Sequence, residues 1–315
     1  MRLLFFGSPA IAVPFLEECL RTGEHSVAAV VTQPDRPAGR GLRLRAPPVK
    51  EAALRLGLPV LQPDRPAAAA AELREARADL GVIVAYGRIL KREVLDIPRL
   101  GLLNVHFSLL PKYRGAAPVQ WALLHGERRT GVTLFWLDEG MDSGPVQRTA
   151  ALDIGPDEDA RALFPRLQSL GVAELGGALA DVAAGRVRRE PQAGESSLAP
   201  KVTAETARVD LGMSAAEVHN RVRALRAAPK AALVLAGPER VALLGTGLDD
   251  GDSGDGPPPP PGTILRVERE KGFLVQCRPG RLWIREVQPE GKKPLSGADF
   301  LNGRRLRAGD RLRPA

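Results

Sequence analysis

The most informative segment of the sequence is Gly101-Leu-Leu-Asn-Val-His-Phe-Ser-Leu-Leu-Pro-Lys-Tyr-Arg-Gly115. Its first half is an apolar run typical of a buried β-strand, and it ends in a proline, a basic pair and a glycine. Asn104 and His106 are two residues apart, so in a strand their side chains project from the same face. An amide donates hydrogen bonds, and an imidazole exchanges a proton near neutral pH. The stretch therefore predicts a strand that carries a site for chemistry on a carbonyl group.

Further apolar runs on the N-terminal side of this stretch predict a parallel sheet. Apolar runs at 3–6, 27–32, 79–86 and 102–106 alternate with helical patterns near 49–56, 67–78 and 91–96. Strands that are apolar on both faces and alternate with helices are typical of an α/β fold with a doubly wound, mostly parallel sheet. Ligands of such sheets bind at the C-terminal ends of the strands, and His106 lies at one such end.

A carboxylate is expected at the same edge. The chain runs from His106 through a helix near 116–125 and a strand near 132–137 into the acidic turn Asp138-Glu-Gly-Met-Asp-Ser-Gly-Pro145. This length of chain is enough for one β–α–β unit that returns to the same edge of the sheet. Asp142 would then hold the imidazole of His106 by one nitrogen and raise the basicity of the ring. Singly, Asp142 also fits a simple turn residue, and Asn104 fits a polar residue that ends a strand. Together the three side chains favour a catalytic site.

The rest of the chain has the pattern of a second, smaller domain. A long helical pattern at 160–184 is followed by a polar, poorly periodic stretch, an Arg-rich helix at 215–226 and short apolar runs at about ten-residue spacing. Several short strands at such spacing predict a small β-barrel or sandwich, and a small basic barrel is compatible with an OB-like module that binds nucleic acid. The expected boundaries are 1–188 for the first domain, 189–208 for a linker and 209–315 for the second domain. His219 lies on the polar helix and is expected to be exposed, and the Asp/Gly/Pro-rich insert 249–261 is expected to be a flexible excursion.

The net charge of +8 is concentrated at the C-terminal end. Residues 263–315 contain 13 Lys/Arg and 6 Asp/Glu, whereas the preceding residues contain 32 and 31. A general compositional bias toward arginine would raise arginine throughout, so we favour a polyanion, and specifically nucleic acid, as the partner of this end. The connection at 33–48, with four arginines and four prolines, is expected to be exposed and irregular. It fits either a solvated surface loop or a loop that grips phosphate or RNA, and its length favours the second.

Several classes of protein are disfavoured. The first predicted strand–helix turn, Gly7-Ser-Pro-Ala10, lacks the glycine pattern of nicotinamide enzymes, and no P-loop motif is present. Cys19 and Cys277 are too far apart to suggest a disulfide framework or a zinc site, and the histidines lack metal-ligand spacing, so no metal is expected. No apolar run is long enough to span a membrane, and the N-terminus fits a first strand better than a secretory signal. The expected compartment is the cytoplasm.

Several motifs resemble the methionyl-tRNA formyltransferase family. They are Asn104-Val-His106-Phe-Ser-Leu-Leu-Pro111 with the Lys-Tyr-Arg-Gly-Ala-Ala-Pro-Val-Gln120 that follows, the loop at 32–41, Val84-Ala-Tyr-Gly87 and Gly140-Met-Asp-Ser-Gly144. Gly291-Lys-Lys-Pro and Leu301-Asn-Gly-Arg-Arg305 resemble the C-terminal domain of that family, so the resemblance covers nearly the whole chain. The Asn-x-His pair and the distal aspartate are shared by folate-dependent formyltransferases, whereas the loop and the C-terminal module are more specific to the tRNA enzymes. The chain departs from the family pattern at Arg226-Ala-Ala-Pro-Lys230, where aromatic residues are usual, and in the insert.

The resemblance implies transfer of a formyl group from 10-formyltetrahydrofolate to the α-amine of methionine on initiator tRNA, for translation initiation. It implies that Asn104 donates to the developing oxyanion and that Asp142 orients His106. His106 would take the ammonium proton or stabilise the oxyanion as imidazolium, and the sequence leaves both roles open. The first domain would bind folate and the second domain would bind tRNA, in a monomeric enzyme without a metal. The implied binding residues are Ser108, Leu109, Leu110, Pro111, Ile89 and Leu90 for folate, and Arg36, Arg40, Arg43, Lys292 and Lys293 for tRNA.

Two alternative functions keep part of this interpretation. The same trio could formylate a different amine, such as a ribonucleotide or an amino sugar, or release formate to water. The basic second domain argues against this, because a small acceptor needs no such surface. A non-catalytic RNA-binding protein with a degenerate formyltransferase domain is the other alternative, and the intact trio argues against it.

Overall fold

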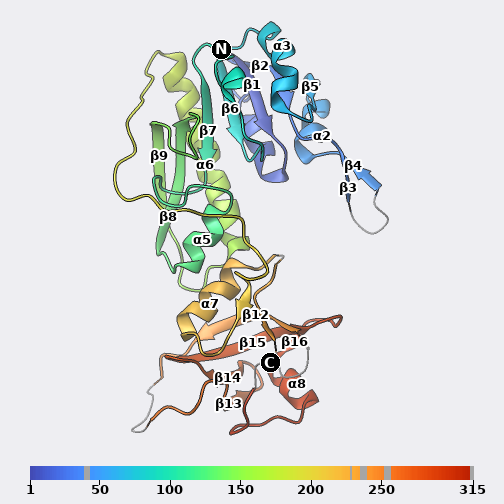
Figure 1. Cartoon of the computed structure of the whole chain (residues 1–315), viewed down its shortest axis with the longest axis vertical. Coiled ribbons are helices and arrows are strands. Elements are labelled where there is room, and N and C mark those ends of the chain that lie inside the picture. The colour runs from blue at the N-terminus through green and yellow to red at the C-terminus, as the bar shows by residue number, and fades with distance from the viewer. Residues whose placement is uncertain (39–42, 228, 235–239, 252–256, 313–315) are drawn as a thin grey trace. The chain divides into compact units, whose positions relative to one another are not determined.

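The computed structural model describes residues 1–38, 43–227, 229–234, 240–251 and 257–312 (Figure 1). The contacts within the chain group it into two compact units, each assembled from several stretches of sequence. The first unit comprises Met1–Pro118, Arg129–Leu152 and Pro165–Pro200, and the second comprises Val119–Arg128, Asp153–Phe164 and Lys201–Ala315. The stretch predicted as a linker, 189–208, divides between the two units at Pro200.

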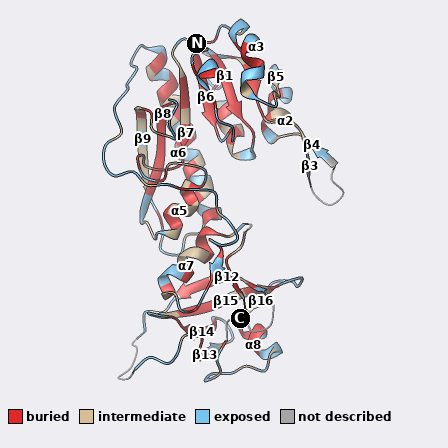
Figure 2. Cartoon of the chain, viewed as in Figure 1, coloured by how far each residue is buried: buried red, intermediate tan, exposed pale blue. Residues whose placement is uncertain are grey.

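The first unit is built on a seven-stranded sheet with the order β5-β2-β1-β6-β7-β8-β9. The pairs among β5, β2, β1, β6 and β7 are parallel, and β7 pairs with β8 in the antiparallel direction. The strands are β1 (Arg2–Gly7), β2 (Ser26–Val31), β5 (Val60–Leu61), β6 (Leu80–Val84), β7 (Leu102–His106), β8 (Arg129–Trp136) and β9 (Val146–Asp153). The central strands are apolar because both of their faces are covered, as the buried residues in Figure 2 show.

Helices pack on both faces of this sheet. On one face, Leu4 and Phe6 of β1 share a core cluster with Leu73 of α3 and Val94 of α4. On the other face, α6 lies against the first helical segment, where Gln168 donates a hydrogen bond to the carbonyl of Ile11. The helices of this unit are η1 (Ala10–Ala12), α1 (Val13–Glu18), α2 (Pro48–Arg55), η2 (Pro66–Ala69), α3 (Ala70–Glu75), α4 (Arg92–Leu95) and most of α6 (Ala160–Ala183), whereas α5 (Pro118–Leu124) is grouped almost wholly with the second unit. The predicted doubly wound, mostly parallel sheet is confirmed.

The second unit contains a mostly antiparallel sheet, which confirms the predicted small domain of short strands. Its strand order is β10-β11-β12-β15-β14-β13, and β16 pairs with β15. The strands are β10 (Arg208–Val209), β11 (Ala232–Val234), β12 (Arg240–Leu248), β13 (Ile264–Glu268), β14 (Gly272–Gln276), β15 (Arg281–Pro289) and β16 (Leu295–Ser296). Helix α7 (Ala215–Ala224) packs against β12, and the short helix α8 (Gly297–Gly303) packs against β15. In the insert, Asp249 pairs with Arg281 at 2.7 Å, while residues 252–256 lie outside the described part of the chain.

Two local expectations were wrong. His219 is buried rather than exposed, because its Nδ1 lies 3.0 Å from Thr246 Oγ1 on β12 and its Nε2 lies 3.4 Å from the carbonyl oxygen of Pro156. The connection at 33–48 is not irregular throughout. It forms a hairpin of β3 (Arg36–Ala38) and β4 (Arg43–Arg45), in which Arg36 pairs with Arg45.

Candidate active site

Strand β7 places Asn104 and His106 on the same face of the sheet. Asn104 lies opposite Phe135 and His106 lies opposite Thr133 on the antiparallel neighbour β8. Leu102 shares this face by the alternation of the strand, and it packs in the core cluster with α3 and α4. The cluster covers Leu102. Asn104 and His106 lie on the same face, nearer the C-terminal end of β7. The predicted juxtaposition of amide and imidazole is therefore present.

His106 is fixed by the turn that follows it. Its Nε2 lies 2.8 Å from the carbonyl oxygen of Tyr113, and a carbonyl can only accept, so Nε2 carries the proton and donates it. Nδ1 faces Asp142, with 3.6 Å between Nδ1 and Oδ2. Burial lowers the pKa of His106, which outweighs the opposing effects of the Asp142 charge and the Tyr113 carbonyl. In the neutral imidazole the lone pair is therefore on Nδ1, on the side of the carboxylate.

Asp142 comes from the turn between β8 and β9, as the sequence predicted. Its Oδ2 accepts a hydrogen bond of 2.7 Å from the backbone N–H of Gly115. Asp142 has φ +49° and Tyr113 has φ +64°, both in the left-handed region that non-glycine residues seldom adopt. Such conformations cost free energy and persist where surrounding contacts hold them, which is common at active sites. The peptide N–H of Gly115 thus holds the carboxylate next to the imidazole.

Asn104 completes the group. Its side chain is half-buried and makes no hydrogen bond with another residue of the described part of the chain. A primary amide carries two N–H donors. The amide of Asn104 is therefore available to a ligand on the face that it shares with His106.

The turn predicted to contact folate is held by its own hydrogen bonds. Ser108 is buried, and its hydroxyl donates to the carbonyl of Lys112 at 2.6 Å. Thr133 Oγ1 donates to the carbonyl of Ser108 and accepts from the N–H of Leu110. Leu109 and Leu110 are half-buried, and Pro111 is buried. The hydroxyl of Ser108 therefore shapes the turn, and direct folate contact by this turn stays a prediction.

The other two predicted folate residues differ in exposure. Ile89 follows β6 and is 88 % exposed, whereas Leu90 is buried in the core cluster with Leu4 and Phe6. Of the two, Ile89 offers its side chain to a ligand and Leu90 supports the turn from beneath. Met141, next to Asp142, is 64 % exposed. Ile89 and Met141 are thus large apolar side chains exposed on the turns that follow β6 and β8. Exposed apolar side chains can pack against a flat heterocycle.

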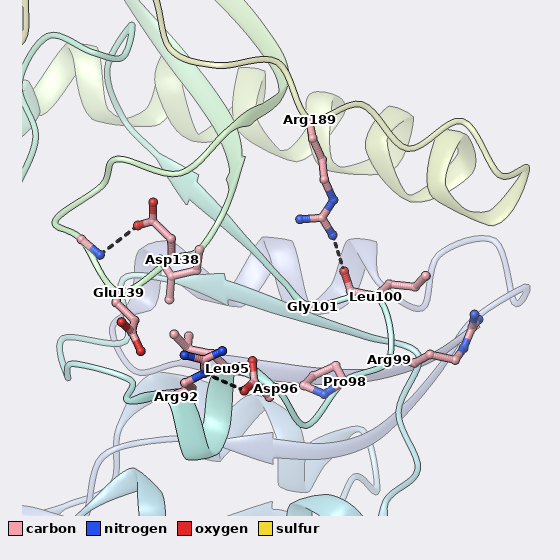
Figure 3. A pocket seen from close by; sticks show the side chains of 12 residues that line it. Arg92, Leu95, Asp96, Pro98, Arg99, Leu100, Gly101, Asp138, Glu139 and Arg189 are labelled. Atoms are coloured by element: carbon pink, nitrogen blue, oxygen red, sulfur yellow. Dashed lines mark hydrogen bonds and ion pairs between the residues drawn. The ribbon is translucent and has the colours of Figure 1, made fainter.

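An open cavity of about 710 Å³ lies beside the turn that leads to Asp142 (Figure 3). Arg92 of α4 and Asp96, which follows that helix, form an ion pair on one side of it, and Arg189 donates to the carbonyl of Leu100 on another. Asp138 and Glu139 line it from the turn itself. The cavity borders the turn, but none of the predicted catalytic or folate residues lines it.

The predicted tRNA residues lie in both units. Arg36 is exposed on the β3–β4 hairpin, and Arg43 is the first residue of β4. Arg40 lies outside the described residues. Lys292 and Lys293 are exposed in the turn between β15 and β16. Exposure permits phosphate contacts by Arg36 and the two lysines, and the role of all five residues stays a prediction.

Sequence reasoning missed the segment 190–199, which packs against this site. Gln192 donates to the carbonyls of Asp142 and Gly144, and Ser197 Oγ accepts from the N–H of Tyr113. The segment is polar and lacks periodicity, so no pattern in the sequence marks these contacts. Within the described residues, no group of three or more His, Cys, Asp or Glu side chains is placed to hold a metal ion. None of the described helices is both long and apolar enough to cross a membrane.

Comparison with known families gives two matches that together cover most of the chain. The Formyl transferase family model matches residues 1–178, and the model of the formyl transferase C-terminal domain matches residues 201–305. A methionyl-tRNA formyltransferase of Elusimicrobium minutum is 41% identical over 331 residues, covering 98% of this chain and 99% of its own length. A methionyl-tRNA formyltransferase of Halorhodospira halophila is 45% identical over 311 residues, covering 98% of each chain.

Solved structures share the fold. HypX from Aquifex aeolicus, in complex with tetrahydrofolic acid, matches with a TM-score of 0.62 and 22% identity over 96% of this chain. This chain spans 47% of the length of HypX. An N-formyltransferase from Helicobacter canadensis, in complex with folinic acid and dTDP-3-aminofucose, matches with a TM-score of 0.66 and 20% identity over 90% of this chain and 98% of its own. At these identities the structures establish the architecture alone, whereas the sequence matches establish the family. The chain belongs to the methionyl-tRNA formyltransferase family.

Proposed function

We propose that this chain transfers the formyl group of 10-formyltetrahydrofolate to the α-amine of methionine carried by initiator tRNA. The observation that carries the proposal is the buried His106, with Nδ1 directed toward Asp142 and with the amide of Asn104 on the same strand face, where no other described residue hydrogen-bonds to it. The relatives named methionyl-tRNA formyltransferase match nearly the full length of the chain, which supports this acceptor over a ribonucleotide or an amino sugar.

The chemistry follows from these three side chains. The amine attacks the formyl carbon, and the carbonyl oxygen of the formyl group gains negative charge as the carbon becomes tetrahedral. An N–H of Asn104 donates to that oxygen, and one such donor contributes about 3 kcal/mol in comparable sites. Collapse of the intermediate breaks the bond to N10 of the folate, which leaves with a proton.

His106 acts as the base in this scheme. Burial lowers its pKa, so the imidazole is neutral near pH 7, and Nδ1 is the nitrogen that can accept the ammonium proton of the attacking amine. Asp142 then stabilises the imidazolium, and the same proton can pass to N10 of the leaving folate. The balance needs no metal and no covalent enzyme intermediate.

The two predicted domains share the binding of the substrates. Residues 1–188 would bind folate, with the turn at 108–111 and Ile89 and Leu90 beside the trio, and residues 209–315 would bind tRNA. Arg36, Arg40, Arg43, Lys292 and Lys293 would contact phosphates, which position the acceptor without reading its sequence. The excess of positive charge in the last 53 residues supports this division. A monomeric state and a cytoplasmic location remain predictions.

The test offers the purified protein 10-formyltetrahydrofolate with three acceptors: methionyl initiator tRNA, methionyl elongator tRNA and methioninamide. We expect transfer to the initiator tRNA in strong preference to the other two. Transfer to methioninamide with no preference for tRNA would show that the acceptor is a small amine. Binding of tRNA with no transfer to any acceptor would show a non-catalytic protein.

A further inference from the structure

The segment 190–199, here called the strap, runs along the turn that carries the site. The N–H of Arg114 donates to the carbonyl of Ser197 at 2.8 Å, and the N–H of Ala199 donates to the carbonyl of Arg114 at 2.7 Å. Gly115, at φ +121°, lies so close that a Cβ there would be 2.9 Å from the carbonyl oxygen of Ala199. The strap is therefore paired with the active-site turn like an added strand, although it follows the whole of the sheet and α6 in sequence.

Gln192 is the residue of the strap that reaches the turn of Asp142. Its Nε2 donates to the carbonyl oxygen of Asp142 at 2.8 Å and to that of Gly144 at 2.9 Å. Its Oε1 accepts from Nε and Nη2 of Arg114, at 3.2 and 2.7 Å. Both donors and the acceptor of this amide are thus used, and they join the two turns from which the site is made.

The backbone at Asp142 needs such support. Asp142 is in the left-handed region, which is unfavourable for a non-glycine residue and persists where surrounding contacts hold it. The contacts of Gln192 hold the peptide carbonyls on either side of Ser143, and the carboxylate of Asp142 then meets the N–H of Gly115. Without Gln192, the turn of Asp142 would lose both of these side-chain donors at once.

We infer that Gln192 is a positioning residue for formyl transfer, which holds the carboxylate of Asp142 at the imidazole of His106. The inference rests on the proposed function for its kinetic consequence but not for its geometry. In the proposed mechanism Gln192 contacts neither the attacking amine nor the formyl carbon. It acts through the backbone of Asp142 and through Arg114.

The test compares three variants. Gln192→Leu removes all four hydrogen bonds at similar volume, and Gln192→Glu keeps the acceptor for Arg114 but loses the two donors to the carbonyls. Gln147→Leu is the matched control. The buried Gln147 donates to the carbonyl of Arg186 and accepts from the N–H of Arg188, so it holds the chain just before the strap, away from Asn104, His106 and Asp142.

All three variants are expected to lower the melting temperature. Both Gln192 variants are expected to lower kcat by about 10- to 100-fold with KM for both substrates little changed, as for other misplaced catalytic groups, whereas Gln147→Leu keeps kcat within about threefold.

A second readout does not depend on turnover. The titration of His106, followed by NMR of ¹⁵N-labelled histidine without substrate, is expected to move to lower pH in Gln192→Leu, because the Asp142 charge raises the pKa of His106 and this variant adds no charge of its own. Gln147→Leu should leave the titration unchanged. Equal titrations in wild type and Gln192→Leu would overturn the inference, even if the acceptor proves to be another amine. Full activity in Gln192→Glu would also overturn it, because Arg114 alone would then be the relevant contact.

Discussion

The Nε2–H of His106 donates a hydrogen bond of 2.8 Å to the carbonyl oxygen of Tyr113, a residue in the left-handed conformation. This contact fixes the tautomer of the neutral ring, because a carbonyl oxygen can only accept. Nδ1 is then the basic nitrogen, and it faces the carboxylate of Asp142. The turn after β7 thereby decides which atom of His106 does chemistry.

Asn104→Ala should lower kcat by about 10²- to 10³-fold, the loss found when one oxyanion donor is removed from an acyl-transfer site. Its amide makes no hydrogen bond with any other residue that the structure describes, so little of the loss should come from instability. Steady-state kinetics with both substrates checks this, with the exposed Asn302→Ala as the control. An unchanged kcat in Asn104→Ala would remove the amide from the mechanism.

The pH dependence of formyl transfer should show an acid limb below pH 6.5, the usual pKa of histidine. Burial lowers the pKa of His106, so the neutral base persists down to that lowered value and activity is lost as the pH falls through it. Asp142→Asn removes the charge that raises this pKa. It should therefore move the limb to lower pH while reducing the rate at pH 7.5. Activity that rises on acidification would mean that His106 acts as an imidazolium donor.

The buried His219 should make unfolding pH-dependent. Burial lowers its pKa in the folded protein, so the unfolded state binds a proton first as the pH falls below about 6.5. The free energy of unfolding is then largest above that pH and declines as the pH falls, by at most about 1.4 kcal/mol per pH unit for one such group, until the folded-state pKa is reached. His219→Asn, which retains an acceptor or donor for Thr246, should flatten this decline in denaturant titrations from pH 7 to 5. An identical decline in both proteins would assign it to other groups.

Lys292 and Lys293 are exposed, and their contribution to tRNA binding can be read from salt dependence. The double change to alanine should weaken tRNA binding and reduce the slope of log K against log salt by about 2, one per phosphate contact. Folate binding should be unaffected. Arg92→Ala is the control, since Arg92 is exposed but paired with Asp96. An unchanged slope would show that the two lysines do not contact phosphates of the tRNA.

The sequence predicted those parts of the structure that local patterns encode. The strand 102–106 was predicted with its observed bounds, because an apolar run ending in Asn-Val-His fits a strand buried on both faces. The grouping of Asn104, His106 and Asp142 was predicted from the two-residue spacing of the first two residues and from the length of chain between His106 and Asp142. The burial of His219 was not predictable, because residues 153–159 cover the polar side of α7 only in the folded chain. The strap was missed for the same reason: Gln192 meets Asp142 across 50 positions of sequence, and a polar, aperiodic segment carries no sign of such a partner.

Single-turnover formylation of methionyl initiator tRNA by His106→Ala tests whether His106 acts in formyl transfer. We expect a rate at least about 10²-fold below wild type, with tRNA affinity retained and with His125→Ala, a change at an exposed histidine, at the wild-type rate. A near-normal rate in His106→Ala would contradict it.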